Sequence, residues 1–147
     1  MAATAVVVWP LAQLSRYCRL AAGQSEGADL LMTAASTGDF AGVRRALDEG
    51  VPPDALYDGC TALQVAGDPA VVRLLLQHGA DPSVWHAHRS PLISAASTGN
   101  VETAELLLNA GADPNEHEPG FPSPLEAARL WRCDAMVQLL LRHGAHP

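Results

Sequence analysis

The stretch that decides the fold is Leu106-Leu-Leu-Asn-Ala-Gly-Ala-Asp-Pro114. Close copies of these nine residues occur at 74–82 and at 139–147, and the last two copies begin 33 residues apart. Recurrence at a fixed interval of about 20 to 50 residues is typical of chains built from stacked copies of one structural unit. The sequence therefore predicts a repeat array.

Two further motifs recur in the same way. Ala-Ala-Ser-Thr-Gly-Asp at 34–39 returns as Ala-Ala-Ser-Thr-Gly-Asn at 95–100, and Ser-Pro-Leu at 90–92 returns 33 residues later at 123–125. Thr61-Ala62-Leu63 begins another copy. We expect a leader over 1–27 and a repeat domain over 28–147. The expected repeats are about 28–57, 58–88, 89–121 and 122–147.

The third repeat predicts a helix, a turn, a second helix and a loop. Pro91 suits the first turn of a helix, where the backbone N–H has no intrahelical partner, and Gly99 can end that helix. Asn100 is placed to cap a second helix, which Gly111 stops. Apolar residues follow that second helix at helical spacing, at Val101, Ala104, Leu107 and Leu108. The first repeat has the same pattern, with Asp39 as the cap.

These motifs together resemble the ankyrin-repeat family over about residues 28–147. The resemblance rests on Thr-Pro-Leu-like openings, alanine pairs, central glycines and Gly-Ala-Asp ends. It implies an all-α repeat solenoid of about four ankyrin-type units, each a helix-turn-helix followed by a hairpin-like loop that projects sideways. It also implies a non-catalytic protein-binding role, as an adaptor or an inhibitor.

The second repeat is shorter than the others. Ala66 and Leu76 are ten residues apart, whereas the corresponding residues of the first and third repeats are twelve apart. We therefore expect a first helix about one turn short, followed by a second helix that begins at Asp68-Pro69. This unit is either a tolerated weak link or a feature that serves a partner. Residues 61–76 also resemble the second repeat of the ankyrin-type inhibitors of cyclin-dependent kinases, which implies kinase inhibition as an alternative function.

Composition excludes several function classes. The 147 residues carry a formal net charge of -7, which disfavours nucleic acids and anionic membranes because both would repel the chain. The absence of lysine excludes Gly-Lys-Ser/Thr phosphate loops, Schiff-base chemistry and protein-kinase catalysis. Three widely spaced cysteines suggest no disulfide framework. We expect a monomer in a reducing compartment, the cytoplasm or the nucleus, and a protein partner with a basic patch.

The loops between repeats are the expected binding surface, because repeat helices use their apolar faces for stacking. We expect Tyr57 and Trp85 to lie at their most exposed points. Trp85 has two interpretations, an interface anchor or a side chain that folds back on its own repeat. The expected contact residues are Tyr57, Asp58, Trp85, His86, His88, Arg89, His117 and Phe121. Glu116 and Glu118 belong to the same third loop, and an adjacent first-helix surface near Gln64, Ser94 and Arg129 is the alternative.

The six histidines favour structural roles over a metal site. His86 and His88 are close enough in sequence to share an ion, but a tetrahedral site needs further ligands, such as His117. His78 and His143 precede the glycine that ends a second helix, where a histidine can bond to the backbone. We expect no metal and no cofactor. The spacing of Leu107, Asp113 and Asn115 resembles that of hydroxylated ankyrin repeats, which implies Asn115 as a hydroxylation site.

The leader permits three interpretations. Leu11, Leu14, Cys18 and Ala21 form an apolar helical stripe in an acid-free segment over 1–25. This pattern is compatible with a cap on the first repeat, with disorder, or with an organellar transit signal. For the whole chain, no catalytic triad or acid pair is recognisable, since Cys60, Cys133 and the histidines come from different repeats. An enzyme of unknown class remains the alternative to a binding module.

Overall fold

The computed structural model describes residues 27–87 and 89–147, so residues 1–26 of the leader and His88 lie outside the described residues. Within these two stretches the chain forms eight helices and no strand. The helices come in four pairs: α2 (Ala28–Thr37) with α3 (Phe40–Asp48), α4 (Ala62–Val65) with α5 (Pro69–Gln77), α6 (Pro91–Thr98) with α7 (Val101–Asn109), and α8 (Pro124–Leu130) with α9 (Asp134–Arg142). The predicted four-repeat helical array is confirmed.

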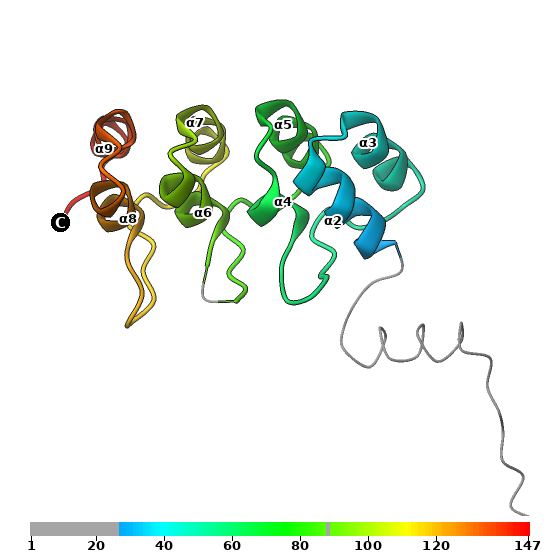
Figure 1. Ribbon diagram of the computed structural model, residues 1–147, viewed down its shortest axis with the longest axis horizontal. Helices are drawn as coiled ribbons and strands as arrows, with labels where there is room; N and C mark the ends of the chain where they lie inside the picture. The colour runs from blue at the N-terminus through cyan, green and yellow to red at the C-terminus, as the bar shows by residue number, and fades with distance from the viewer. Residues whose placement is uncertain (1–26, 88) are drawn as a thin grey trace, which may run out of the picture.

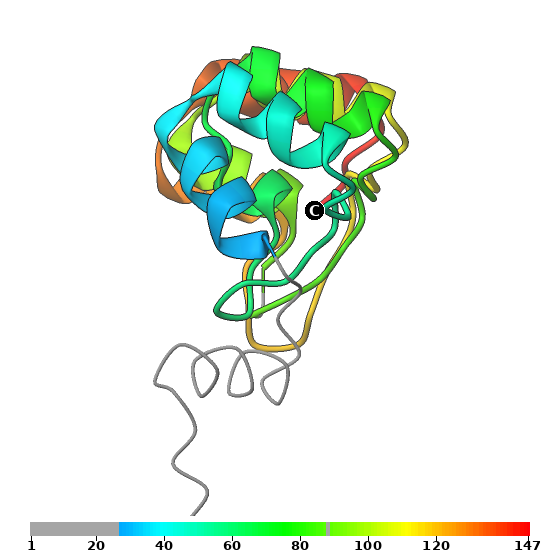
Figure 2. The same cartoon turned by 90° about the vertical axis from the view of Figure 1, so that its right-hand side faces the viewer.

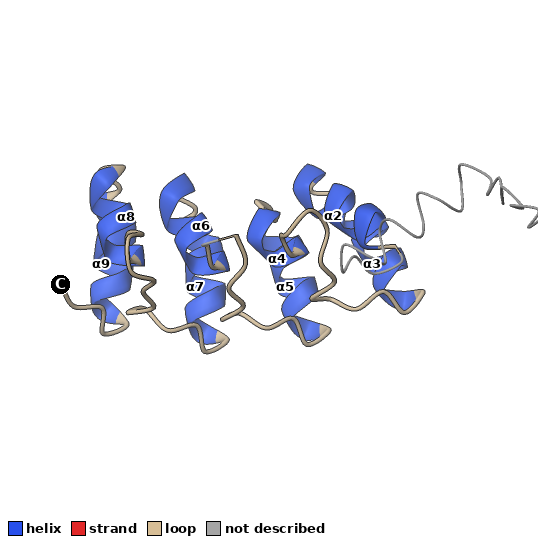
Figure 3. Cartoon of the chain, turned by 90° about the horizontal axis from the view of Figure 1, so that it is seen from below, coloured by secondary structure: helices blue, strands red, loops and turns tan. Residues whose placement is uncertain are grey.

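The helix pairs stand in a row and make two layers (Figure 1). The first helices α2, α4, α6 and α8 form one layer, and the second helices form the other. Three long loops, which we call the first, second and third hairpins (50–61, 79–90 and 111–123), project to the same side as the first-helix layer (Figure 2). Seen from below, they follow one another along the array (Figure 3).

Repeated buried positions hold the array together. Leu31, Leu63, Leu92 and Leu125 occupy the same place in successive first helices, and each side chain is at most 1% exposed. Burying a leucine contributes roughly 2 kcal/mol. Because all four leucines belong to one continuous core, stability depends on stacking, as in other solenoids.

The helix ends follow the predicted capping residues. The carboxylate of Asp39 accepts a hydrogen bond from the N–H of Gly42, and the carboxamide of Asn100 accepts one from Thr103. Gly38 and Gly99 end α2 and α6 with φ of 74° and 71°, a left-handed conformation that favours glycine.

The second repeat has the predicted short first helix. α4 has four residues, against eight in α6, which is about one turn less. The second helix of this repeat is intact, because the carboxylate of Asp68 accepts from the N–H of Ala70 and Pro69 stands at the first helical position.

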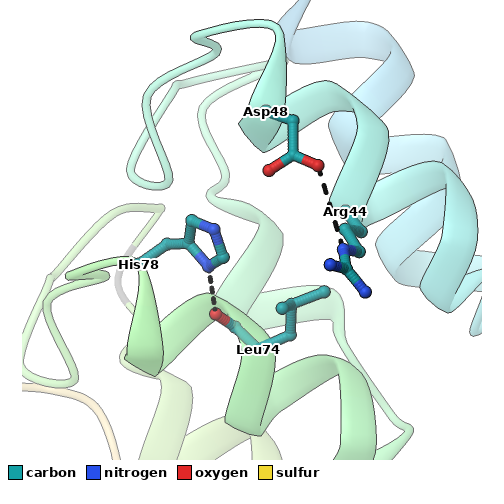
Figure 4. A network of polar contacts seen from close by, with 4 residues as sticks. All are labelled: Arg44, Asp48, Leu74 and His78. Atoms are coloured by element: carbon teal, nitrogen blue, oxygen red, sulfur yellow. Dashed lines mark hydrogen bonds and ion pairs between the residues drawn. The ribbon is translucent and has the colours of Figure 1, made fainter.

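His78 has the structural role that its position predicted. Its Nδ1 lies 3.0 Å from the carbonyl oxygen of Leu74 in the last turn of α5, and since a carbonyl only accepts, Nδ1 carries the proton (Figure 4). The ion pair between Arg44 and Asp48 in the same view is 3.8 Å long and mostly exposed. Such surface pairs stabilise a fold by at most about 1 kcal/mol.

Candidate partner-binding surface at the hairpin tips

The tips of the first two hairpins are tight turns. Tyr57 and Cys60 exchange backbone hydrogen bonds of 3.0 Å across the first turn. His86 and Arg89 do the same across the second, at 3.2 and 3.1 Å. Asp58 (φ 50°) and Ala87 (φ 51°) take left-handed conformations inside these turns, which are uncommon for residues other than glycine. Paired backbone hydrogen bonds thus hold the described residues of both tips.

Gln64 ties the second tip to the body of the array. Its Oε1 accepts from the N–H of Thr61 at 2.9 Å, and its Nε2 donates to the carbonyl oxygens of His86, at 3.1 Å, and Arg89. The Gln64 side chain is buried, with 8% of the residue exposed. One side chain thus caps α4 and fixes the turn of the next hairpin.

An open groove of about 500 Å³ lies between the second and third hairpins. It is lined by Trp85, His86, Ala87, His117 and Glu118, and we call it the tip groove. It brings together three of the eight expected contact residues, Trp85, His86 and His117. The other described ones lie on the hairpins without lining it: Tyr57 and Asp58 on the first, Arg89 on the second and Phe121 on the third. His88 is outside the described residues.

Two expectations about exposure were wrong. Tyr57 and Trp85 are half-buried instead of lying at the most exposed points of their hairpins. The Trp85 side chain lowers the pKa of Glu116 in the third hairpin, and both hairpins line the same groove, so Trp85 lies toward the next unit along. The alternative surface on the first helices is also mostly closed, because Gln64 is buried and Ser94 half-buried, whereas Arg129 is exposed.

Glu116 is the residue for which the sequence was most misleading. Expected at a loop tip, it is 7% exposed, and its Oε1 accepts a hydrogen bond from the Ser90 hydroxyl. Burial raises the pKa of this carboxyl to about 7, more than the hydrogen bond from Ser90 lowers it, and nearby Asp113 raises it further. A signal was present, because the same position in the two earlier hairpins is apolar, Ala55 and Val84.

A second set of polar contacts joins consecutive hairpin bases. Both oxygens of the Asp54 carboxylate lie 3.1 Å from the N–H of Asp81. At the equivalent position of the third hairpin, Asn115 donates to the carbonyl oxygen of Gly144 at 3.0 Å and accepts from the N–H of His146 at 2.9 Å. Asn115 is therefore a structural tie to the last repeat as well as the asparagine implied as a hydroxylation site.

One exposed apolar feature was missed by the sequence reasoning. Leu130, the last residue of α8, is 72% exposed. Trp131, in the turn that follows, is 65% exposed, and Arg132 comes next with φ of 54°. The equivalent turn of the third repeat is Ser97-Thr98-Gly99, in which the threonine hydroxyl bonds back to helix carbonyls. The interval of 33 residues that aligns the two turns was the available signal.

The described residues contain neither a metal-binding cluster nor a membrane-spanning helix. Among them, no group of three or more His, Cys, Asp or Glu side chains is gathered in a way that could hold a metal ion. Cys60 and Cys133 are free thiols. None of the described helices has the length and apolar character needed to pass through a bilayer.

Several proteins with ankyrin repeats are similar to this chain. A family model described as ankyrin repeats (many copies) matches residues 65–108. The chain is 40% identical over 86 residues to an ADP-ribosylation factor GTPase-activating protein of Arabidopsis thaliana. The matched region covers 56% of this chain and 11% of that protein. The chain is 35% identical over 128 residues to human ankyrin repeat and MYND domain-containing protein 1, covering 67% and 13%.

A third relative matches nearly the whole chain. The ankyrin repeat, SAM and basic leucine zipper domain-containing protein 1 of Dasypus novemcinctus is 30% identical over 149 residues, which cover 93% of this chain and 31% of that protein. The chain thus spans less than a third of the length of each of these relatives. The family match, these relatives and the four stacked helix pairs together show that this chain is an ankyrin-repeat protein.

Proposed function

We propose that this chain is a non-catalytic interaction module that binds a protein partner at the tips of its second and third hairpins. The observation that carries the proposal is the tip groove, which gathers Trp85, His86 and His117. Interface anchors are enriched in aromatic residues and arginine, and Arg89 is exposed beside the groove. The buried bonds of Gln64 hold this surface in place before a partner arrives, which reduces the entropy lost on binding.

The charge of the hairpins favours a basic partner. Their exposed and half-buried side chains include five carboxylates and one arginine: Asp54, Asp58, Asp81, Asp113 and Glu118 against Arg89. An acidic surface attracts a basic patch and repels nucleic acid, and this attraction weakens as salt rises. We propose a monomer that acts in the cytoplasm or nucleus, where free thiols such as Cys60 and Cys133 persist.

A double substitution tests the proposal. Arg89→Ala with His117→Ala removes two exposed side chains at the tips, neither of which uses its side chain in the hydrogen bonds described above. The matched control replaces exposed Gln138 and Arg142 of α9. The amount of partner that the tip variant captures should be about tenfold or more below that of the wild type, as expected when an interface anchor is lost. The control variant should capture as much partner as the wild type. Equal capture by both variants at unchanged melting temperature would place the interface elsewhere.

The four-residue α4 favours a second candidate function, inhibition of a cyclin-dependent kinase. The first helix of the second repeat is about one turn short, and the second repeat of the kinase inhibitors that it resembles also has a curtailed first helix. Addition of the purified chain to a cyclin-dependent kinase assay tests it. If the kinase transfers phosphate at an undiminished rate in the presence of excess purified chain, this function is rejected and the adaptor role remains.

We also propose Asn115 as a target of asparaginyl hydroxylation. Its side-chain bonds to Gly144 and His146 hold the carboxamide, so the enzyme must first release the end of the array. Intact-mass analysis after incubation with an asparaginyl hydroxylase should show one added oxygen. The Asn115→Asp variant should show none, and an unchanged mass for the wild type rejects the site.

A further inference from the structure

Glu116 differs from its counterparts in both chemistry and contacts. Where the first hairpin has Ala55, 4% exposed, and the second has Val84, the third places a carboxyl group that is 7% exposed. A buried carboxyl is costly unless its oxygens are paired. Its oxygen Oε2 has no hydrogen-bond partner among the described residues. The position therefore holds a group that destabilises the fold when it is charged.

One of its contacts takes the place of a bond that the second repeat makes locally, in which the Thr61 hydroxyl donates to Gln64 at 3.4 Å. The residue that caps the first helix is Thr61 in the second repeat and Ser123 in the fourth, and each is paired with the side chain three residues later, Gln64 or Glu126. In the third repeat that later residue is Ile93, which cannot accept a hydrogen bond. The hydroxyl of Ser90 therefore donates to Glu116 of the following hairpin while it accepts from the N–H of Ile93.

The carboxyl thereby lies where three segments meet. Ser90, which donates to it, begins α6, Trp85 belongs to the second hairpin and Glu116 to the third. The side chains of the described residues that shift its pKa are Ser90, Trp85 and Asp113, and none of them is a cation. Trp85 lines the tip groove, and His117 follows Glu116 directly on its other side. A change at Glu116 is therefore adjacent to both walls of the groove.

We propose that Glu116 is a proton-dependent latch between the second and third hairpins, which holds the tip groove in its binding shape when protonated and loosens it when the proton leaves. The effect of the latch on partner binding rests on the proposed function, whereas the movement of the third hairpin itself does not. The neutral carboxyl stays buried beside Ser90 and Trp85. The charged carboxylate is drawn toward water, which separates the third hairpin from Trp85 and widens the groove.

The direction of the switch follows from the burial. Because burial raises the pKa of Glu116 to about 7, the latch is closed in mildly acidic solution and opens as pH rises through neutrality. The groove also holds His86 and His117. Both are unchanged in every Glu116 variant, so a comparison of these variants isolates the contribution of Glu116.

Fluorescence of Trp85 tests the latch without a partner. Replacing Trp9 and Trp131 by phenylalanine leaves Trp85 as the sole tryptophan. Its emission maximum should move to longer wavelength as pH rises, in a transition centred at about 7. Glu116→Gln is neutral at every pH and should abolish the transition, and so should Glu116→Val, which copies the second hairpin. Glu105→Gln, an exposed acid on α7, should leave it unchanged.

The latch is overturned if the fluorescence transition persists in Glu116→Gln and Glu116→Val, or if the wild type shows no transition. If circular dichroism shows that Glu116→Gln is unfolded, the comparison with Glu116→Val decides between these outcomes. A second measurement uses a partner captured by the wild type: its affinity should fall severalfold between about pH 6 and pH 8, and this fall should vanish in Glu116→Gln. The two proposals can fail separately. If Trp85 shows the fluorescence transition but Arg89→Ala with His117→Ala does not reduce partner capture, the proposed binding site is rejected and the latch is retained.

Discussion

Replacing Gln64 by alanine should lower the free energy of unfolding by about 3 kcal/mol, because this one side chain of α4 makes several buried hydrogen bonds. The substitution removes an acceptor from the N–H of Thr61, which is fully buried, and a donor to two carbonyl groups of the second tip. Leaving a buried donor unpaired costs about 1 to 3 kcal/mol, and each further hydrogen bond lost costs about 1 kcal/mol. We expect a total loss of about 3 kcal/mol, equivalent to a melting temperature lower by about 10 °C for a chain of this size.

Urea unfolding followed by circular dichroism measures this loss. Glu126→Ala is the matched control, because Glu126 occupies the same position in the fourth repeat but is exposed and bonds only within its own helix start. Hydrogen exchange adds a local readout. The amides of His86 and Arg89 should exchange faster in Gln64→Ala, while those of Tyr57 and Cys60 should not change. A loss below about 1 kcal/mol, or one equal to that of the control, would refute this role of Gln64.

Three other predictions follow from single contacts. Because the pKa of Glu116 is raised from 4.5 to about 7, the folded chain retains a proton there that the unfolded chain has released, so stability should fall as pH rises through this window. Urea unfolding at about pH 5 and pH 8 should show wild type losing about 2 to 3 kcal/mol relative to Glu116→Gln, and a constant difference would contradict it. Amides of α4 should exchange faster than those of α6, because α4 is about one turn shorter; equal protection would mean that the deletion is absorbed without loss. Arg132→Gly should stabilise the chain by about 1 kcal/mol, because Arg132 has φ of 54° where the first and third repeats have glycine. The control Arg129→Gly, inside α8, should destabilise the chain. Thermal melts that show the reverse order of stability would reject this explanation.

Sequence reasoning succeeded where one residue decides a local structure. Asp39, Asp68 and Asn100 cap helices because their short side chains reach a backbone N–H nearby, and this requires no knowledge of the rest of the fold. The missing turn of α4 followed from counting residues between aligned positions. Gly99 ends its helix because it accepts a positive φ.

The same reasoning was limited where contacts span repeats. Glu116 looks like a loop acid, and its burial depends on Ser90, 26 residues earlier, and on an apolar residue at the helix position where Gln64 stands in the second repeat. Trp131 is a large aromatic side chain, yet it lies in a turn and is 65% exposed. Aligning the repeats against one another reveals both departures, because each changes the chemical class of a repeated position.

The most direct test of the binding surface is photo-crosslinking from single positions. A photoreactive amino acid in place of His117 would lie in the tip groove, and one in place of Gln138 would lie on exposed α9 in the other helix layer. With a partner captured by the wild type, we predict a covalent adduct from position 117 and none from position 138. Adducts from position 138 alone would contradict the assignment of the hairpin tips as the partner-binding surface.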